Sequence, residues 1–265
     1  MTVVRQVSSR HNELFKDLRR LLADPAAYRK LGRVWLEGDH LCRALIERGR
    51  VPLRAIVTES GWAAPALAAL ARHAPEVVCV PDALMRELSG LESPPAIGFL
   101  IEAGDAAAPR AGIDTVVLDR LQDPGNVGSI LRTASAMGFA QVVALKGTVA
   151  LWSPKVLRAG MGAHFALALV EGAAIADVAA LGVPVVGTHL HDADWLHESR
   201  LPAPLAWVFG HEGQGMSAPM TAACTLRVRI AQPGGEESLN VAAAAAMCLY
   251  ESARTRLAPA DQRAG

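Results

Sequence analysis

The stretch LDRLQDPGNVGSILRTASAMGF, residues 118–139, decides how this chain folds, because it leads from an apolar strand through a turn into a helix. A proline and two glycines fit a tight turn at the helix start: Pro124, Gly125 and Gly128. Asn126 can bond backbone groups or a ligand at that helix N-terminus, and Arg132 follows one to two turns later. An ordinary strand-to-helix loop with an exposed arginine also explains the stretch. Whether the stretch is functional therefore has to be judged from the rest of the sequence.

Apolar runs alternate with helical segments throughout the second half of the chain. We expect strands at Thr115–Leu118, Gln141–Leu145, Phe165–Val170, Val183–Thr188, Ala206–Phe209 and Leu226–Ile230. Strands that are apolar at every position are buried on both faces, which predicts a parallel sheet covered by helices. The last helix is expected over Leu239–Leu257, and its Ala242–Ala246 run lets a neighbouring element or a second subunit approach closely.

The first half predicts a smaller αβ domain. Leucines and Phe15 at helical spacing predict an amphipathic basic helix over Asn12–Leu31. Further elements are expected as strands at Arg33–Glu37, Arg54–Thr58, Val77–Pro81 and Ile97–Glu102, and as helices at Leu41–Arg48 and Pro65–His73. Periodicity stops in AGDAAAPRAG, residues 103–112. We therefore expect a first domain over residues 1–105, a linker over 106–112 and a second domain over 113–265.

Composition excludes several classes of protein. The 265 residues are 51% hydrophobic and 20% charged, which excludes a disordered chain. No apolar run reaches the ~18 residues of a membrane span, and the start MTVVRQVSSRHNELFKDLRR is charged where a signal peptide would be apolar, so we expect a cytoplasmic protein. The cysteines lack metal-ligand spacing and are expected to be buried apolar residues: Cys42, Cys79, Cys224 and Cys248.

Charge is divided unevenly along a chain whose formal net charge is zero. Residues 1–54 carry net +6 and the remainder net −6, and ten of the twelve cations in residues 1–54 are arginines. Arginine pairs bidentately with phosphate and stacks on bases. The positive charge of residues 1–54 is consistent with either a surface that binds nucleic acid or a helical face exposed to solvent.

Two further strand-loop-helix junctions contain glycine-rich loops: LAWVFGHEGQGMS at 205–217 and RIAQPGGEESLNVAAAAAMCLYE at 229–251. Glycines at the carboxyl end of a strand let a ligand approach the backbone. GHEGQG is not a dinucleotide-binding fingerprint, and GxSxG is absent, so neither a dinucleotide fold nor an α/β-hydrolase is supported. Ser238 and Asn240 also fit simple helix caps. Three such loops on one sheet edge predict a pocket.

DPGNVGSILRTASAMGF, FGHEGQGMS and ESLNVAAAAAMCLYE resemble, in order and spacing, the three signature motifs of the SpoU/TrmH group of the SPOUT superfamily of RNA methyltransferases. The match covers roughly residues 113–256, and SSRHNELFKDLRRLL through WLEGDHLCRALIE is similar to the group's small substrate-binding domain. The resemblance implies a parallel α/β fold with a deep trefoil knot and a homodimer packed through the knot helices. It also implies methyl transfer from S-adenosylmethionine to a ribose 2′-hydroxyl, without a metal.

The resemblance assigns roles to individual residues. Arg132 matches the arginine that helps to activate the 2′-hydroxyl, and the other matches at the catalytic pocket are Asn126, Glu212, Ser238 and Asn240. The positions that contact the cofactor, largely through backbone, are Thr188, Gly210, Ile230 and Leu239. The basic N-terminus supplies the expected RNA-binding residues Arg10, Lys16, Arg19 and Arg20. Because free arginine has a pKa above ~12, Arg132 acts either as proton acceptor or as an orienting, electrostatic group.

Some positions depart from the family pattern, and some alternatives stay open. Ala231 replaces a usual proline, His211 a usual small residue or asparagine, and Gly160 a frequent serine, all near the cofactor loops. Ribosomal RNA, 23S in particular, is the expected substrate and tRNA the alternative. Two rival functions stay open. The protein could bind RNA or assist ribosome assembly without catalysis, or it could methylate a base nitrogen instead of a ribose.

Overall fold

The computed structural model describes residues 2–104, 108–190, 192–235, 238–254 and 256–257. The chain divides into two compact units, one of Met1–Asp105 with Trp152–Phe165 and one of Ala106–Leu151 with Ala166–Gly265. The segment Trp152–Phe165 thus interrupts the continuous second domain expected from the sequence. It joins the first unit because α8 (Pro154–Gly160) packs on β2 (Arg33–Glu37), where Arg158 Nη1 lies 3.4 Å from Glu37 Oε2.

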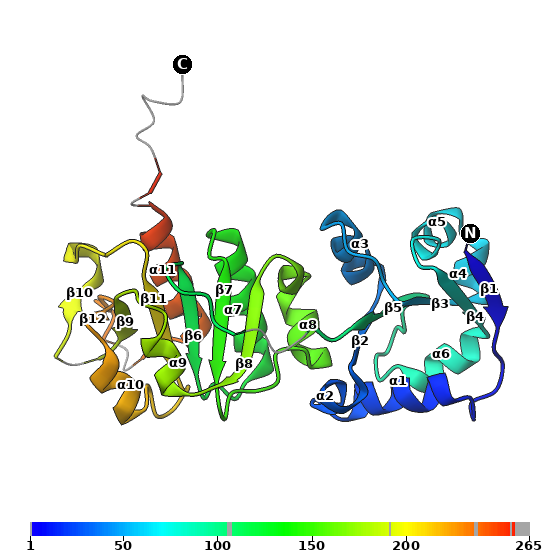
Figure 1. Ribbon diagram of the computed structural model, residues 1–265, viewed down its shortest axis with the longest axis horizontal. Helices are drawn as coiled ribbons and strands as arrows, with labels where there is room; N and C mark the ends of the chain where they lie inside the picture. The colour runs from blue at the N-terminus through cyan, green and yellow to red at the C-terminus, as the bar shows by residue number, and fades with distance from the viewer. Residues whose placement is uncertain (1, 105–107, 191, 236–237, 255, 258–265) are drawn as a thin grey trace, which may run out of the picture. The chain divides into compact units, whose positions relative to one another are not determined.

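The first unit is built on a mixed sheet with the strand order β1-β4-β3-β5-β2 (Figure 1). β1, β4 and β3 run parallel, and β5 is antiparallel to both β3 and β2. The other strands are β1 (Val3–Gln6), β3 (Arg54–Thr58), β4 (Glu76–Val80) and β5 (Ile97–Glu102). The helices are α1 (Glu13–Ala23), α2 (Ala27–Leu31), α3 (Asp39–Glu47), α4 (Glu59–Ala63), α5 (Pro65–Ala71) and α6 (Asp82–Leu88), with the 3₁₀ turn η1 (Ala163–Phe165).

The helix expected over Asn12–Leu31 is divided into α1 and α2. Asp24 precedes Pro25 and has an extended backbone (φ −108°, ψ 112°), which ends α1 at Ala23. Asn12 begins α1 as expected of a cap, since its side chain accepts a hydrogen bond of 2.9 Å from the Leu14 N–H. The apolar face of α1 is buried through Leu14, Phe15, Leu18 and Leu21, so the periodicity located this face correctly.

The second unit contains a sheet in which all the described strand pairs are parallel, in the order β10-β12-β9-β11-β6-β7-β8 (Figure 1). The strands are β6 (Thr115–Asp119), β7 (Gln141–Leu145), β8 (Ala168–Ala173), β9 (Val185–Thr188), β10 (Asp194–Trp195), β11 (Ala206–Gly210) and β12 (Leu226–Arg229). The helices are α7 (Pro124–Ala136), α9 (Ile175–Ala179), α10 (Ala218–Ala223) and α11 (Val241–Arg254), with the 3₁₀ turn η2 (Leu196–Glu198). The predicted parallel α/β fold is confirmed.

The expected bounds of β2, β3, β5 and β7 are confirmed, and β6 and β11 each extend one residue beyond the expected end. Every residue of β6, β7 and β11 is buried, as continuous apolar runs predicted. The strand expected from Phe165 begins only at Ala168, because Phe165 belongs to η1. β1 and β10 were not expected: β1 is exposed at every position, and β10 has two residues.

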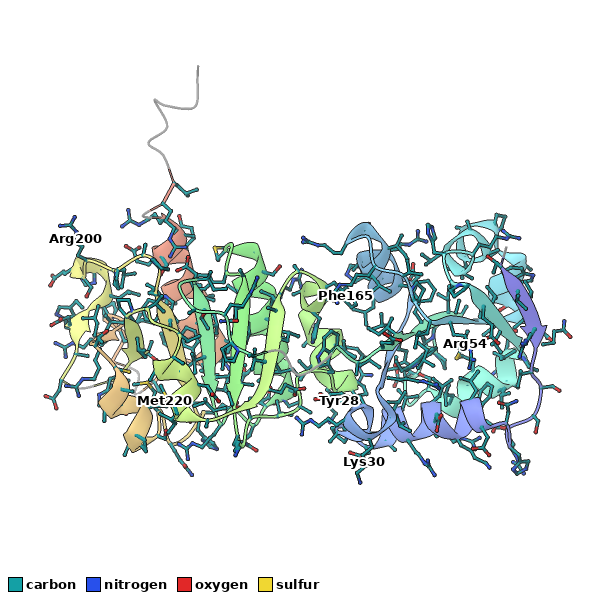
Figure 2. All side chains as sticks on the ribbon, in the orientation of Figure 1. Tyr28, Lys30, Arg54, Phe165, Arg200 and Met220 are labelled. Atoms are coloured by element: carbon teal, nitrogen blue, oxygen red, sulfur yellow. The ribbon has the colours of Figure 1, made fainter. Side chains whose placement is uncertain are left out.

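Helices cover both faces of the parallel sheet. On one face Val117, Val143 and Val208 pack with Val178 of α9 and Met220 of α10, which is labelled in Figure 2. On the other face α11 packs against α7 and β11, and the buried Trp207 Nε1 donates a hydrogen bond of 2.8 Å to Ser252 Oγ. Within the alanine run of α11, Ala245 is buried in this packing, whereas Ala243 is exposed. None of the described helices combines the length and apolar character that crossing a membrane requires.

The order of the strands determines where a site can form. From β6 the chain continues outward through β7 and β8, then returns to build β9 and β11 on the other side of β6. In a parallel α/β sheet, such a reversal opens a crevice at the carboxyl ends of the strands. The loops that follow β6, β9, β11 and β12 all leave from that edge, and they include the three motifs.

Candidate active site

Three loops meet at the carboxyl edge through side chains of the three motifs. Asn126 Nδ2 donates to Glu212 Oε1 over 3.3 Å, and Asn240 Nδ2 donates to Asn126 Oδ1 over 3.0 Å. The three residues lie far apart in the sequence, on the loops or helix starts after β6, β11 and β12. The structure thus joins three of the five predicted catalytic residues in one hydrogen-bonded row.

Each member of this row is also fixed to its own loop. Asp123 caps α7 and accepts a 2.8 Å hydrogen bond from the Asn126 N–H. Asn240 caps α11, since its Oδ1 accepts from the N–H groups of Ala242 (2.9 Å) and Ala243 (3.2 Å). Capping and the contact to Asn126 use different atoms of Asn240, so the cap alone does not explain this side chain.

Glu212 is held as a carboxylate. Its oxygens accept hydrogen bonds from the backbone N–H groups of Gln122 (3.2 Å) and Asp123 (3.0 Å). Partial burial acts to raise the pKa of Glu212, but the backbone N–H groups, with the Asn126 amide, outweigh it and lower this pKa below its ordinary value of 4.5. Glu212 therefore carries its charge near neutral pH and ties the loop after β11 to the start of α7.

A cavity of about 460 Å³ opens beside this row. All four predicted cofactor positions line it: Thr188, Gly210, Ile230 and Leu239. Glu212 and Ser238 line it too, whereas Asn126 and Asn240 lie outside its lining. Its volume falls in the usual range of cofactor and small-molecule sites.

Two further lining residues were missed from the sequence. Arg229 Nε and Gln232 Oε1 are buried atoms without a hydrogen-bond partner among the described residues, and both residues line the cavity. Buried donors and acceptors in proteins are normally paired. The walls thus fit a ligand that brings both hydrogen-bond acceptors and donors, such as a nucleoside carrying an amino acid. Nothing in the sequence pattern indicated these side chains, because their environment arises from tertiary packing.

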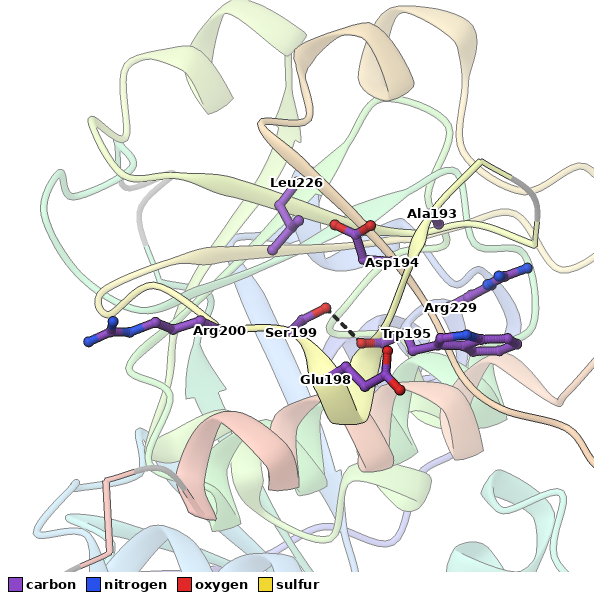
Figure 3. Close-up of a pocket in the computed structure, with 8 residues that line it drawn as sticks. All are labelled: Ala193, Asp194, Trp195, Glu198, Ser199, Arg200, Leu226 and Arg229. Carbon is purple, nitrogen blue, oxygen red and sulfur yellow. Dashed lines mark hydrogen bonds between the residues drawn. The ribbon is translucent and has the colours of Figure 1, made fainter.

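Arg229 also belongs to a second, more polar cavity. Its guanidinium carbon lies 3.7 Å from the centre of the Trp195 ring, and Figure 3 shows the two side chains together. This cavity has a volume of about 420 Å³ and is lined by Ala193, Asp194, Trp195, Glu198, Ser199, Arg200, Leu226 and Arg229. Arg229 therefore forms a shared wall between the two cavities.

Arg132 is placed differently from the other predicted catalytic residues. It is exposed on α7 and does not line the 460 Å³ cavity, and its guanidinium has no hydrogen bond or ion pair within the described part of the chain. Its charge is free to meet an anionic group that comes from outside its own chain.

The predicted RNA-binding cations lie on or next to α1. Arg10, Lys16, Arg19 and Arg20 are all exposed. Three of them have carboxylate neighbours: Lys16 with Glu13 at 2.6 Å, Arg19 with Glu87 at 3.5 Å and Arg20 with Asp17 at 4.0 Å. Exposed pairs of this kind are weak and can be exchanged for a phosphate.

The departures from the family pattern lie in different places. His211 Nδ1 accepts hydrogen bonds from the N–H groups of Gly213 (3.0 Å) and Gln214 (3.3 Å), so it shapes the glycine-rich loop. Ala231 is exposed beside Ile230. Gly160 is the last residue of α8 and belongs to the first unit.

None of the four cysteines lines the 460 Å³ cavity. Cys42, Cys79 and Cys248 are buried, as expected, whereas Cys224 is half-buried. Burial raises the pKa of the Cys224 thiol to about 11, so it is protonated at neutral pH. Within the described residues, no group of His, Cys, Asp and Glu side chains could hold a metal ion.

Comparisons with known proteins agree with this geometry. Residues 114–250 match the family model described as the SpoU rRNA Methylase family. A protein of Synechocystis named as a tRNA/rRNA methyltransferase is 30% identical over 265 residues, covering 96% of each chain. A 23S rRNA (uridine(2479)-2′-O)-methyltransferase of Streptomyces viridochromogenes is 28% identical, covering 96% of this chain and 93% of its own. The crystal structure of an AdoMet-bound rRNA methyltransferase from Sinorhizobium meliloti superposes with a TM-score of 0.83 at 26% identity, covering 96% and 99% of the two chains.

Proposed function

Because the chain belongs to the SpoU rRNA methylase family, we propose that it transfers a methyl group from S-adenosylmethionine to a ribose 2′-hydroxyl of ribosomal RNA. The observation that carries this proposal is the row Asn126, Glu212 and Asn240, which joins the three motif loops beside the cavity. The resemblance inferred from those motifs is confirmed by the family match.

The cavity suits the cofactor. Thr188, Gly210, Ile230 and Leu239 would surround it. The aminocarboxylate, adenine and ribose groups of S-adenosylmethionine supply both donors and acceptors, which is what the unpaired Gln232 Oε1 and Arg229 Nε require. When bound there, S-adenosylmethionine would supply an electrophilic methyl group on its sulfonium.

Residues of this chain would prepare the hydroxyl. Its free pKa is far above neutral, so a positioned cation or proton acceptor is needed. Arg132 would serve either as that acceptor or by holding the neighbouring RNA phosphate and lowering the hydroxyl's pKa. The row of Asn126, Glu212 and Asn240 would hold the three loops in place relative to one another. Ser238 lies at the cavity wall.

We further propose that the enzyme is a cytoplasmic homodimer with a deep trefoil knot. The strand order supports the knot, because β12 inserts between β9 and β10, which precede it in the chain. Exposed apolar side chains on α11, Met247 (44%) and Tyr250 (54%), support a subunit contact there. Residues 1–105 would bind RNA through the cations of α1, and the domain boundaries at 106–112 belong to the same proposal.

Mass spectrometry of nuclease-digested ribosomal RNA tests the function directly. RNA from a strain lacking the gene should lose one 2′-O-methylated nucleotide, and purified enzyme with S-adenosylmethionine should restore it. Restoration in tRNA instead would transfer the proposal to the alternative substrate. A complete methylation pattern in the deletion strain, with no transfer in vitro, would favour the rival RNA-binding function.

A further inference from the structure

Arg120 adopts a backbone conformation that is unusual for an arginine. Its φ is 63°, in the left-handed region where glycine is the ordinary residue. A residue other than glycine is strained in this region, and it keeps this backbone conformation only when contacts with its surroundings maintain it. Arg120 directly follows β6 and lies at the carboxyl edge beside the motif loops.

The backbone of Arg120 is fixed by the neighbouring loop after β7. Its N–H donates to Thr148 Oγ1 over 3.1 Å, and that hydroxyl donates to the Leu118 carbonyl over 2.9 Å. Gly147 has a φ of 92°, and a Cβ there would lie 3.4 Å from Arg120 Cγ. Arg120 thus packs against the loop after β7 through its backbone N–H and the first carbons of its side chain.

That side chain reaches the glycine-rich loop after β11. Arg120 Nε donates to Asp119 Oδ1 over 3.2 Å, and its Nη1 donates to Gln214 Oε1 over 3.3 Å. Asp119 has a side chain only 2% exposed, and its other oxygen accepts the Ser217 N–H at 2.5 Å. Asp119 and Arg120 therefore hold two separate points of the loop.

The loop that they hold is a wall of the cavity. Residues 210–216 all line it. The loop is tightly folded, since His211 and Gly215 exchange backbone hydrogen bonds of 3.0 and 2.8 Å. A Cβ at Gly210 would lie 2.2 Å from the Met216 nitrogen, so the loop closes directly over the end of β11. Glu212 ties one half of this loop to α7, and the other half has the contacts to Arg120 and Asp119.

We propose that Arg120, supported by Asp119, is a positioning residue that holds loop 211–217 in its cofactor-binding conformation before the cofactor arrives. This inference rests on the proposed function, because it takes S-adenosylmethionine as the occupant of the cavity. A loop held in advance costs less ordering on binding, so affinity improves without any direct contact from Arg120. The strained backbone of Arg120 is the cost of placing its guanidinium there.

Arg120→Gly tests positioning at the loop itself. The variant relieves the left-handed strain but leaves the nearly buried Asp119 carboxylate without its cation, so the two effects on the melting temperature oppose each other and its net change should be small. It loses the contacts to Gln214 and Asp119, so hydrogen exchange of loop 211–217 without ligand should become faster. Its Kd for S-adenosylmethionine, measured by calorimetry, should rise by about tenfold, with KM rising and kcat nearly constant.

Two other variants complete the experiment. Arg120→Lys keeps the positive charge beside Asp119 and should restore part of the affinity, while Lys146→Ala, an exposed cation in the same unit, should change neither exchange nor affinity. Wild-type affinity and exchange in Arg120→Gly would overturn the inference, as would a loss of affinity that only parallels a loss of stability. If the wild type fails to bind S-adenosylmethionine, the proposed cofactor is wrong, whereas faster loop exchange in the glycine variant still supports the positioning of the loop.

Discussion

Glu212 combines an exposed position with contacts that favour its charged form. The backbone N–H groups of Gln122 and Asp123 point at its oxygens, so a neutral carboxyl would lose much of this interaction. The negative charge of Glu212 therefore also stabilises the fold. It holds the loop after β11 to the N-terminus of α7, where negative charge is also favoured by the helix dipole.

The lowered pKa of Glu212 gives a pH dependence with a definite sign. Because the folded-state pKa lies below 4.5, its stabilising contribution is present above about pH 4.5 and is lost as the pH falls through the folded-state value. Glu212→Gln should therefore be less stable to urea than wild type at pH 7, and the difference should shrink at pH 4. Urea midpoints at pH 7, 5 and 4 measure it. A difference that stays constant with pH would contradict the assigned cause.

Gln232 offers a direct test of cofactor contact. Gln232→Met removes the buried acceptor at similar side-chain length, so a ligand donor paired with Oε1 would lose its partner. We expect the Kd for S-adenosylmethionine to rise by about five- to tenfold, the size of one hydrogen bond. Calorimetry measures this, with Lys146→Ala as the control. Unchanged affinity would show that the ligand leaves Gln232 unpaired or that water satisfies it.

At the scale of elements, α1 shows how a local pattern can give the right face and the wrong length. The spacing of Leu14, Phe15 and Leu18 predicted the buried side correctly. The same pattern continued past Pro25, where the restriction on Asp24 ends the helix. Helical periodicity extends over the break because it measures which face is apolar, not whether the backbone is continuous.

The separation of the α1 cations from Arg132 predicts two different losses. Replacing Arg19 and Arg20 by alanine should weaken RNA binding and flatten its salt dependence, since fewer counterions are released. The expected loss of RNA affinity is reduced by Glu87 and Asp17, because each arginine must break its ion pair with one of these carboxylates before it binds a phosphate. Turnover at saturating RNA should change little.

The measurement is RNA affinity as a function of salt, with Arg227→Ala as the control, an exposed arginine on β12 of the other unit. An unchanged salt slope in the Arg19/Arg20 variant would assign α1 to a solvated face. Other exposed cations of the same unit, such as Arg10, would then become the candidates for phosphate contacts.

The three motifs predicted which loops would meet at one edge of the sheet, just as continuous apolar runs predicted several strands. Asn126, Glu212 and Asn240 were assigned by resemblance, and the structure brings them within hydrogen-bond distance. Arg229 and Gln232 could not be found in this way, because burial of their polar atoms depends on Trp195 and on the loop after β12. A sequence pattern identifies loops that share an edge, whereas a buried unpaired atom is a property of the packed molecule.

At the scale of the whole molecule, one chain does not bring all the predicted catalytic residues together. Glu212 and Ser238 line the cavity, while Arg132 is exposed on α7 outside it. The resemblance implies that both subunits contribute to one active site. We therefore expect Arg132 of one protomer to act at the cavity of its partner, so that a monomer would be inactive.

Mixing two inactive variants tests this arrangement. Arg132→Ala should reduce single-turnover methylation by about a hundredfold or more while leaving cofactor affinity nearly intact, and Glu212→Ala should disrupt the cavity loop. Light scattering should first give about twice the 27.9 kDa chain mass for each variant.

After subunit exchange, half of the dimers contain one chain of each kind. If Arg132 acts across the interface, each mixed dimer has one site with both defects and one site with neither, so turnover should recover to about a quarter of wild type. If Arg132 acts within its own chain, every site keeps one defect and the mixture stays inactive. Recovery without exchange, in dimers crosslinked before mixing, would instead indicate contamination by active enzyme.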